Sequence, residues 1–184
     1  MSAHGHRAYI DTMLFVYHLG RPKSDTFHKL AVQFFLDIEN GNYEGVITTF
    51  TQTEYIAVMK ELLSQRIGAP LSLTQLNTLR SEFETFIDKE GIELLDSDDL
   101  STSVGHCEIF KWSSQVVDAC RAVMGRHDYK WRTIGGADAI HAVFANRAGS
   151  DLLVTFDGGF KAISSLASAG WKLRPLIIPD VYHP

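Results

Sequence analysis

Four acidic residues lie far apart in this sequence, and they share one kind of local setting: Asp11, Glu54, Asp138 and Asp157. Asp11 and Asp157 each follow an apolar run of the kind that forms a buried strand. Glu54 opens a helical pattern just after a third such run, and Asp138 stands behind two glycines at the start of another helical pattern. Ligands bind an open parallel sheet at the edge formed by the carboxyl ends of its strands, so the four carboxylates are predicted to converge there.

Carboxylates that lie together repel one another and raise one another's pKa unless cations neutralise them. The cations that prefer oxygen ligands are Mg²⁺ and Mn²⁺. We therefore expect one or two of these ions to be held by the four acids. Asp11 is the expected bridging ligand, because it ends the first strand, which is predicted to be central.

Each acid also has a purely structural explanation. Asp11 and Asp157 could each cap the helix that follows, and Asp138 could favour the positive end of its helix. The pair Thr51 and Glu54 fits a capping box, in which Glu54 reaches back to the Thr51 backbone. The functional interpretation depends on the recurrence of acids at one edge. It also depends on the glycine pairs beside Asp138 and Asp157, which capping does not require and which let a phosphate come close.

The elements that must position these acids alternate between strand and helix. Strands are predicted at 8–11, 45–49, 92–95, 152–156 and 173–178, and helices at 13–19, 24–39, after the second strand as far as Gly68, at 72–89, at 109–124, from Asp138 and at 160–167. This order predicts an α/β fold, a three-layer α/β/α sandwich around a parallel sheet of about five strands. No linker or repeat interrupts the pattern, so residues 1–184 are predicted to form one domain.

Four motifs resemble, in order, those of the PIN-domain ribonucleases, and the VapC-type toxins most of all. They are Ile10-Asp11-Thr12, the Thr-x-x-Glu at 51–54, the helix start at 138–142 and the Thr-x-Asp-x-x-Phe element at 155–160. The resemblance covers nearly the whole chain. It implies an α/β/α sandwich whose four acids hold Mg²⁺ or Mn²⁺ and cut RNA. It also implies a homodimer, and an antitoxin protein as partner. The sequence departs from the pattern at Met13, where the family often has Asn or Ser.

The expected reaction is hydrolysis of an RNA phosphodiester bond that leaves a 5′-phosphate and a 3′-hydroxyl. Thr155 is predicted to orient Asp157, and Thr12 is predicted to support the ligands without binding metal itself. His141, one turn after Asp138, is interpreted as a core or groove histidine, with a substrate contact as the alternative.

A net charge of −5 argues at first against a nucleic-acid partner. The four acids contribute −4 of this charge, so two divalent cations would leave the protein near −1. Basic side chains are dense in one segment and are interpreted either as a solvated face or as phosphate contacts. The candidate RNA-contacting residues there are Arg121, Arg126, Lys130, Trp131 and Arg132, and Trp131 could stack on a base.

Other functions remain as alternatives. The chain could be a housekeeping RNA-processing nuclease, or a catalytically silent PIN-like scaffold that binds a protein partner through the leucine-rich stripe at 73–87. A phosphatase of the haloacid dehalogenase kind would need a second aspartate where Met13 stands. A dinucleotide-binding domain would need a Gly-x-Gly-x-x-Gly after the first strand.

Composition excludes few classes. The chain is 45% hydrophobic and 21% charged, as is usual for globular domains, and no apolar run reaches the roughly 20 residues of a membrane span. The first residues lack the apolar core of a signal peptide, so a cytoplasmic protein is expected. Cys107 and Cys120 are too few and too far apart for a zinc or redox motif.

Overall fold

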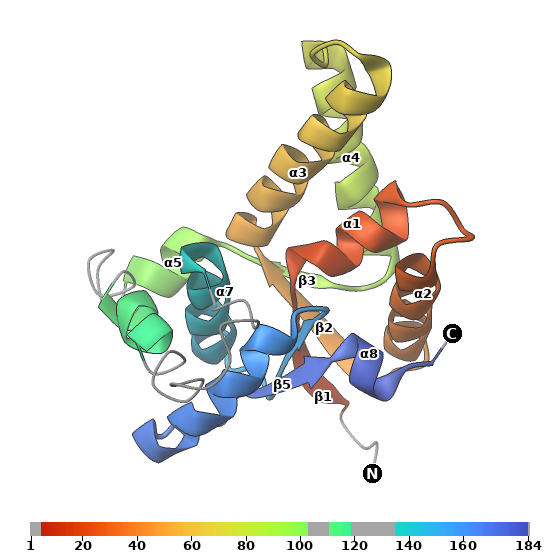
Figure 1. Cartoon of the computed structure of the whole chain (residues 1–184). Helices are drawn as coiled ribbons and strands as arrows, with labels where there is room; N and C mark the ends of the chain where they lie inside the picture. The colour runs from red at the N-terminus through yellow and green to blue at the C-terminus, as the bar shows by residue number, and fades with distance from the viewer. Residues whose placement is uncertain (1–4, 103–110, 119–134, 184) are drawn as a thin grey trace, which may run out of the picture.

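A five-stranded parallel sheet forms the centre of the molecule (Figure 1). The computed structural model describes residues 5–102, 111–118 and 135–183. The strands are β1 (His6–Ile10), β2 (Tyr43–Thr48), β3 (Glu93–Leu95), β4 (Leu152–Thr155) and β5 (Arg174–Ile177). Their spatial order is β3-β2-β1-β4-β5, so β1 is the central strand. The predicted three-layer α/β/α sandwich is thereby confirmed.

Helices follow the strands in the order that the apolar pattern predicted. They are α1 (Thr12–Gly20), α2 (Thr26–Glu39), α3 (Thr49–Ile67), α4 (Leu73–Lys89), α5 (Ser97–Thr102), α7 (Gly136–Arg147), the 3₁₀ helix η1 (Gly158–Ala169) and α8 (Ile178–Val181). Residues 111–118 are also helical; the rest of the helix predicted at 109–124 lies outside the described residues.

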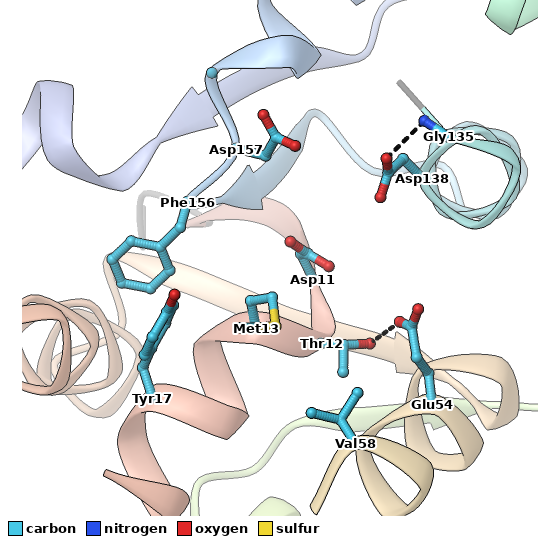
Figure 2. Close-up of a pocket in the computed structure, with 11 residues that line it drawn as sticks. Asp11, Thr12, Met13, Tyr17, Glu54, Val58, Gly135, Asp138, Phe156 and Asp157 are labelled. Atoms are coloured by element: carbon cyan, nitrogen blue, oxygen red, sulfur yellow. Dashed lines mark hydrogen bonds between the residues drawn. The ribbon is translucent and has the colours of Figure 1, made fainter. Parts of the chain in front are cut away.

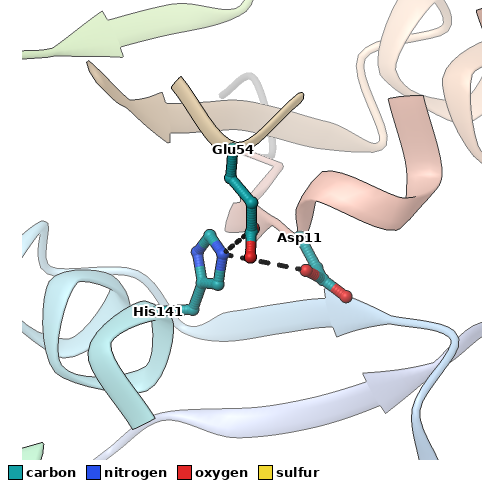
Figure 3. Close-up of side chains that lie close together, drawn as sticks. All are labelled: Asp11, Glu54 and His141. Atoms are coloured by element: carbon teal, nitrogen blue, oxygen red, sulfur yellow. Dashed lines mark hydrogen bonds and ion pairs between the residues drawn. The ribbon is translucent and has the colours of Figure 1, made fainter. Parts of the chain in front are cut away.

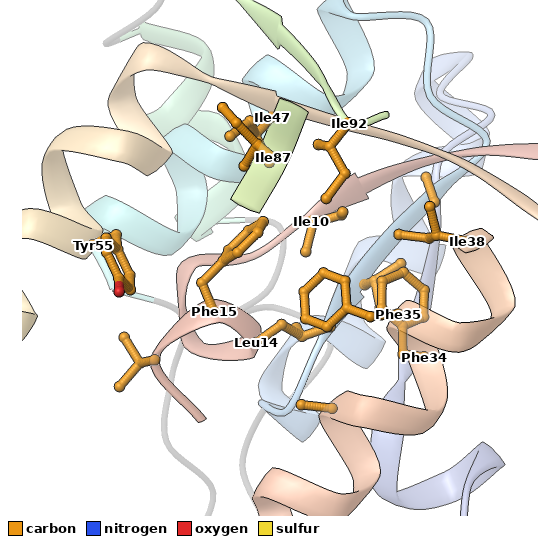
Figure 4. Close-up of a cluster of buried hydrophobic side chains, with 14 of the residues drawn as sticks. Ile10, Leu14, Phe15, Phe34, Phe35, Ile38, Ile47, Tyr55, Ile87 and Ile92 are labelled. Atoms are coloured by element: carbon orange, nitrogen blue, oxygen red, sulfur yellow. The ribbon is translucent and has the colours of Figure 1, made fainter. Parts of the chain in front are cut away.

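The two faces of the sheet carry separate hydrophobic cores, because side chains of a strand point alternately to opposite faces. Ala8 and Ile10 of β1 lie in a core built mainly from α1, α2, α3 and α4, and Figure 4 shows its aromatic centre around Phe15. Tyr9, between them, lies in the core formed with α7 and η1. Alternation along one central strand thus fixes which helices cover which face.

The α3 and α4 helices form an antiparallel pair that projects beyond the sheet (Figure 1). Tyr55 of α3 stacks on Phe83 of α4 with ring centroids 4.4 Å apart, and Leu79 and Ile87 are also buried. At the tip, Leu73 keeps 73% of its surface exposed. Most of the leucine-rich stripe therefore packs inside the molecule and is not exposed as a surface for a protein partner.

Two details of the predicted elements were wrong. The α3 helix begins at Thr49, directly after β2, so Thr51 and Glu54 lie inside it and do not form a capping box. The first strand, predicted to include Asp11, ends at Ile10, so Asp11 lies in the connection between β1 and α1. Within the described ranges, no helix combines the length and apolar character needed to cross a membrane.

Candidate active site

Asp11 lies where the central strand ends, and its side chain is nearly buried, with 7% of the residue exposed. Its backbone amide donates to the carbonyl of Val154 at 3.0 Å, which ties this position to the end of β4. Asp11 occupies the N-cap position of α1, but its side chain makes no capping hydrogen bond. Its Oδ2 instead accepts a hydrogen bond from Thr155 Oγ1 at 2.7 Å. The capping alternative thus does not account for this carboxylate.

Burial raises the pKa of the Asp11 carboxyl. The nearby His141 and the hydrogen bond from Thr155 act in the opposite direction, whereas Glu54 and Asp138 raise the pKa further. A carboxylate held in these surroundings is stabilised by a nearby positive charge. The electrostatics of Asp11 therefore favour cation binding.

Glu54 reaches the same place from the second turn of α3. Its Oε2 lies 2.7 Å from His141 Nε2 and accepts a hydrogen bond from Thr12 Oγ1 at 2.5 Å. Burial opposes ionisation of Glu54, but the hydrogen bond and charge of His141, together with the Thr12 hydroxyl, outweigh it and lower the pKa. Glu54 is therefore held ionised, with its carboxylate fixed by two partners.

A buried network behind His141 sets how this ring is held. The hydroxyl of Tyr9 lies 3.0 Å from His141 Nδ1, from Thr48 Oγ1 and from Thr51 Oγ1. Burial raises the pKa of Tyr9, so its hydroxyl keeps its proton. When that proton is donated to Nδ1, the hydrogen of a neutral His141 is on Nε2, which faces Glu54.

Asp138 and Asp157 each use one carboxylate oxygen to hold local backbone. Asp138 Oδ2 accepts from the amide of Gly135 at 2.8 Å, at the start of α7. Asp157 Oδ1 accepts from the amide of Gly159 at 2.7 Å and so caps η1. The structural roles considered for these two acids are present. They involve one oxygen of each carboxylate and leave the other outside these contacts.

The four acids nevertheless line one cavity of about 630 Å³, shown in Figure 2. They come from four separate segments, at the carboxyl ends of β1 and β4, on the second turn of α3 and on the first turn of α7. Tyr17, Val58 and Phe156 line the same cavity, as do Thr12, Met13, Gly135 and Gly158.

Three donor atoms are close enough to share one ion. Carboxylate oxygens of Asp11 and Glu54 and a ring nitrogen of His141 all lie within 4.8 Å of one another (Figure 3). His141 Nε2 is 4.0 Å from Asp11 Oδ1. The carboxylate oxygens suit Mg²⁺ or Mn²⁺, whereas His141 could be a ligand only with no hydrogen on Nε2, which is not the tautomer that its contact with Tyr9 favours. The residues present therefore fit a divalent ion.

Two contacts within the site were not foreseen from the sequence. No metal or carboxylate contact was predicted for His141. It lies three residues after Asp138, however, and this spacing puts both residues on one face of the helix. The pairing of Tyr9 with His141 joins β1 to α7, and no local pattern indicates it. Thr155 touches Asp157 through the backbone amide at 3.0 Å, in addition to its bond with Asp11.

Some predicted residues fall outside the described part of the chain. They are the candidate RNA contacts Arg121, Arg126, Lys130, Trp131 and Arg132, and both cysteines, Cys107 and Cys120. Their proposed roles stay predictions.

The family model of the PIN domain matches residues 8–166. This match spans most of the chain and includes all four acids that line the cavity. A search of the curated proteins found no match.

Proposed function

The chain belongs to the PIN domain family, and from that premise we propose that it is a Mg²⁺- or Mn²⁺-dependent endoribonuclease. Members of this family are generally nucleases that use divalent metals, so a hydrolase is the coarse expectation for this fold. The observation that carries the proposal is the single cavity into which four separate segments bring Asp11, Glu54, Asp138 and Asp157. Four acids around one cavity repel one another, and a bound cation would offset that repulsion.

In the proposed mechanism, Asp11, Glu54, Asp138 and Asp157 hold one or two divalent ions. When bound, the metal supplies a water of lowered pKa and polarises the scissile phosphate. Thr155 fixes the carboxylate of Asp11 by its 2.7 Å hydrogen bond. His141 and Thr12 fix Glu54 in the same way. These hydrogen bonds thus orient the metal-binding carboxylates before any ion binds. Such pre-orientation is the main contribution that a protein makes to a metal site.

The finer role we propose is that of the toxin in a toxin–antitoxin pair, acting in the cytoplasm as a homodimer. Its support is the sequence resemblance to VapC-type proteins described above. A housekeeping RNA-processing nuclease would use the same site residues, so the chemistry is independent of this choice.

The test is cleavage of an end-labelled panel of RNAs with Mg²⁺, with Mn²⁺ and with EDTA. We expect cleavage only with metal, and its loss in the Asp11→Asn variant with the fold retained. Asp88→Asn is the matched control, because it removes the same charge from the exposed surface of α4, away from the cavity. Absence of cleavage from every RNA, or cleavage that persists in EDTA, would overturn the proposal. The first of these outcomes would favour a silent scaffold.

A further inference from the structure

The cavity that holds the acids has a second wall of different chemistry. Tyr17 of α1 and Phe156 after β4 line it on the side away from Glu54 and Asp138, Met13 lies between, and Val58 lines it beside Glu54 on α3 (Figure 2). These apolar side chains are only half-buried. Apolar surface left open inside a cavity, next to a charged site, is typical of a place that a ligand covers.

The aromatic part of this wall is held in place by ring packing. The centroid of Phe156 lies 4.8 Å from that of Tyr17, with the rings 74° apart. Tyr17 in turn stacks on Phe27 at 4.9 Å and 25°. Phe27 also packs edge-on against Phe156 at 5.5 Å. Mutual contacts among these rings fix Phe156 and Tyr17 as a preformed surface, which lowers the entropic cost of binding a flat ligand.

We propose that Met13, Tyr17 and Phe156 form a nucleobase subsite, which takes one unpaired base of the strand whose phosphate lies at the carboxylates. The inference rests on the proposed function and adds to it the class of substrate. A nucleotide has an apolar, flat base on one side and an anionic phosphate on the other. The cavity offers the matching pair of surfaces, because its aromatic wall and its metal-fitting carboxylates are continuous.

Stacking on aromatic side chains is tolerant of sequence, since every base has a π-face. A base paired within a duplex is stacked on its neighbours and is not free to enter the cavity. The subsite therefore selects single-stranded segments, loops or bulges over continuous duplex. The guanidinium of the exposed Arg21 lies over the Tyr17 ring, 5.8 Å from its centroid, and can move to a flanking phosphate when a base takes its place.

A side chain of a protein partner is the rival occupant of this wall. The nucleobase is favoured because the apolar surface is part of the same cavity as the metal-fitting acids, and is not a separate face of the molecule.

The first test is binding of a short single-stranded RNA that carries 2-aminopurine at one position at a time. The native chain with Ca²⁺ in place of Mg²⁺ is used, so that the carboxylates can hold a cation while the strand stays intact. We expect strong quenching of the fluorophore at one position, because stacking on an aromatic ring quenches it. Phe156→Leu and Tyr17→Leu should reduce that quenching and weaken binding about tenfold. Tyr43→Leu is the matched control, because Tyr43 is a half-buried aromatic residue of β2 that packs on Phe34 and does not line the cavity.

Three outcomes would overturn the subsite. One is quenching that survives in both Phe156→Leu and Tyr17→Leu. Another is quenching lost equally in Tyr43→Leu, which would show that the loss does not depend on the aromatic wall. The third is a probe that stays unquenched at every position. In that case no base stacks on the wall, and a side chain of a protein partner becomes the favoured occupant.

Cleavage kinetics of chains that keep all four acids distinguish failure of this inference from failure of the proposed function. If both hold, Phe156→Leu raises KM for a single strand about tenfold and leaves kcat nearly unchanged. An abasic residue at the quenched position should raise KM of the native chain similarly, and have no added effect in Phe156→Leu. If the chain cleaves RNA but Phe156→Leu changes neither constant, only the subsite fails. If no RNA is cleaved or bound, both proposals fail.

Discussion

The hydroxyl of Thr155 links two acids that are 146 positions apart in the sequence. It donates to Asp11 Oδ2 at 2.7 Å and accepts from the amide of Asp157 at 3.0 Å. Thr155 is fully buried at the end of β4. One side chain therefore sets the geometry between the ends of two neighbouring strands.

Thr155→Val keeps the shape of the side chain but removes both hydrogen bonds. We expect the free energy of unfolding to fall by about 1–3 kcal/mol, because two buried polar groups lose a partner. Affinity for Mn²⁺ should fall roughly 10–100-fold as Asp11 is released. Urea unfolding and calorimetry measure these effects. The matched control is Thr53→Val on the exposed face of α3; a Thr155→Val chain with native Mn²⁺ affinity would contradict the positioning role.

The Tyr9 hydroxyl is predicted to set the tautomer of His141. Tyr9→Phe should lower the free energy of unfolding by about 1–3 kcal/mol, because three buried polar atoms share this hydroxyl. In ¹⁵N NMR, native His141 should carry its hydrogen on Nε2, and Tyr9→Phe should give a mixture of tautomers and slower cleavage. Tyr55→Phe, in the other core, is the control. Identical tautomers in the native and Tyr9→Phe chains would rule out this role.

The identities of the acids were accessible from the sequence because each acid ends a strand or begins a helix. Their partners were not. Tyr9, Thr51 and His141 meet through contacts between segments about 40 to 130 positions apart, and such contacts leave no local pattern. Thr51 illustrates the difficulty: its spacing from Glu54 imitates a capping box, whereas its hydroxyl binds Tyr9.

At the scale of elements, the strands were predictable because parallel strands covered on both faces read as short apolar runs. All five strands lie within two residues of their predicted ends. Helix starts were less accessible. The α3 helix begins directly after β2 at an N-cap, Thr48, whose side chain makes no capping bond, so the sequence carries no local start signal there. The one-turn helix α8 was not predicted.

The packing of α1 against α2 and α4 encloses a histidine that the proposed mechanism does not use. The His18 ring lies parallel to that of His28, with centroids 5.7 Å apart, and contacts Phe35 and Phe86. Its buried Nδ1 has no hydrogen-bond partner among the described residues. Burial, and then the charge of His28, lower the pKa of His18 to about 4.

This histidine predicts a loss of stability in acid. Between pH 6.5 and about 4, the unfolded chain binds a proton at His18 that the folded chain does not, so stability falls as the pH falls. Because His18 is only partly buried, we expect about 1–2 kcal/mol from this source. His18→Leu should reduce the fall by that amount in urea unfolding at pH 7 and pH 4.5. The exposed His183→Leu should not, and equal pH profiles for native and His18→Leu chains would contradict the assignment.

At the scale of the whole molecule, charge and site are linked. The net charge of −5 opposes binding of a polyanion, and in the proposed mechanism the acids around the cavity lie where the scissile phosphate would bind. One divalent cation would offset two of the four negative charges of these acids, and two cations would offset all four.

We therefore predict that RNA affinity depends on metal before any cleavage occurs. Fluorescence anisotropy of a labelled RNA should be measured with Ca²⁺, which also prefers oxygen ligands, and in EDTA. The RNA should bind at least about tenfold more tightly with Ca²⁺, a difference of about 1.4 kcal/mol in binding free energy. The Asp11→Asn chain should show a smaller difference, and Asp88→Asn the native one. Equal affinity in Ca²⁺ and EDTA would mean that RNA binds elsewhere on the molecule.

The measurement that tests the central claim most directly is a calorimetric titration of Mn²⁺ into the native, Asp11→Asn and Asp88→Asn chains. The claim is that the carboxylates around the cavity form one divalent-ion site centred on Asp11. It predicts saturable binding to the native and Asp88→Asn chains, and affinity at least about tenfold weaker for Asp11→Asn. Equal binding by all three chains, or no binding to the native chain, would contradict it.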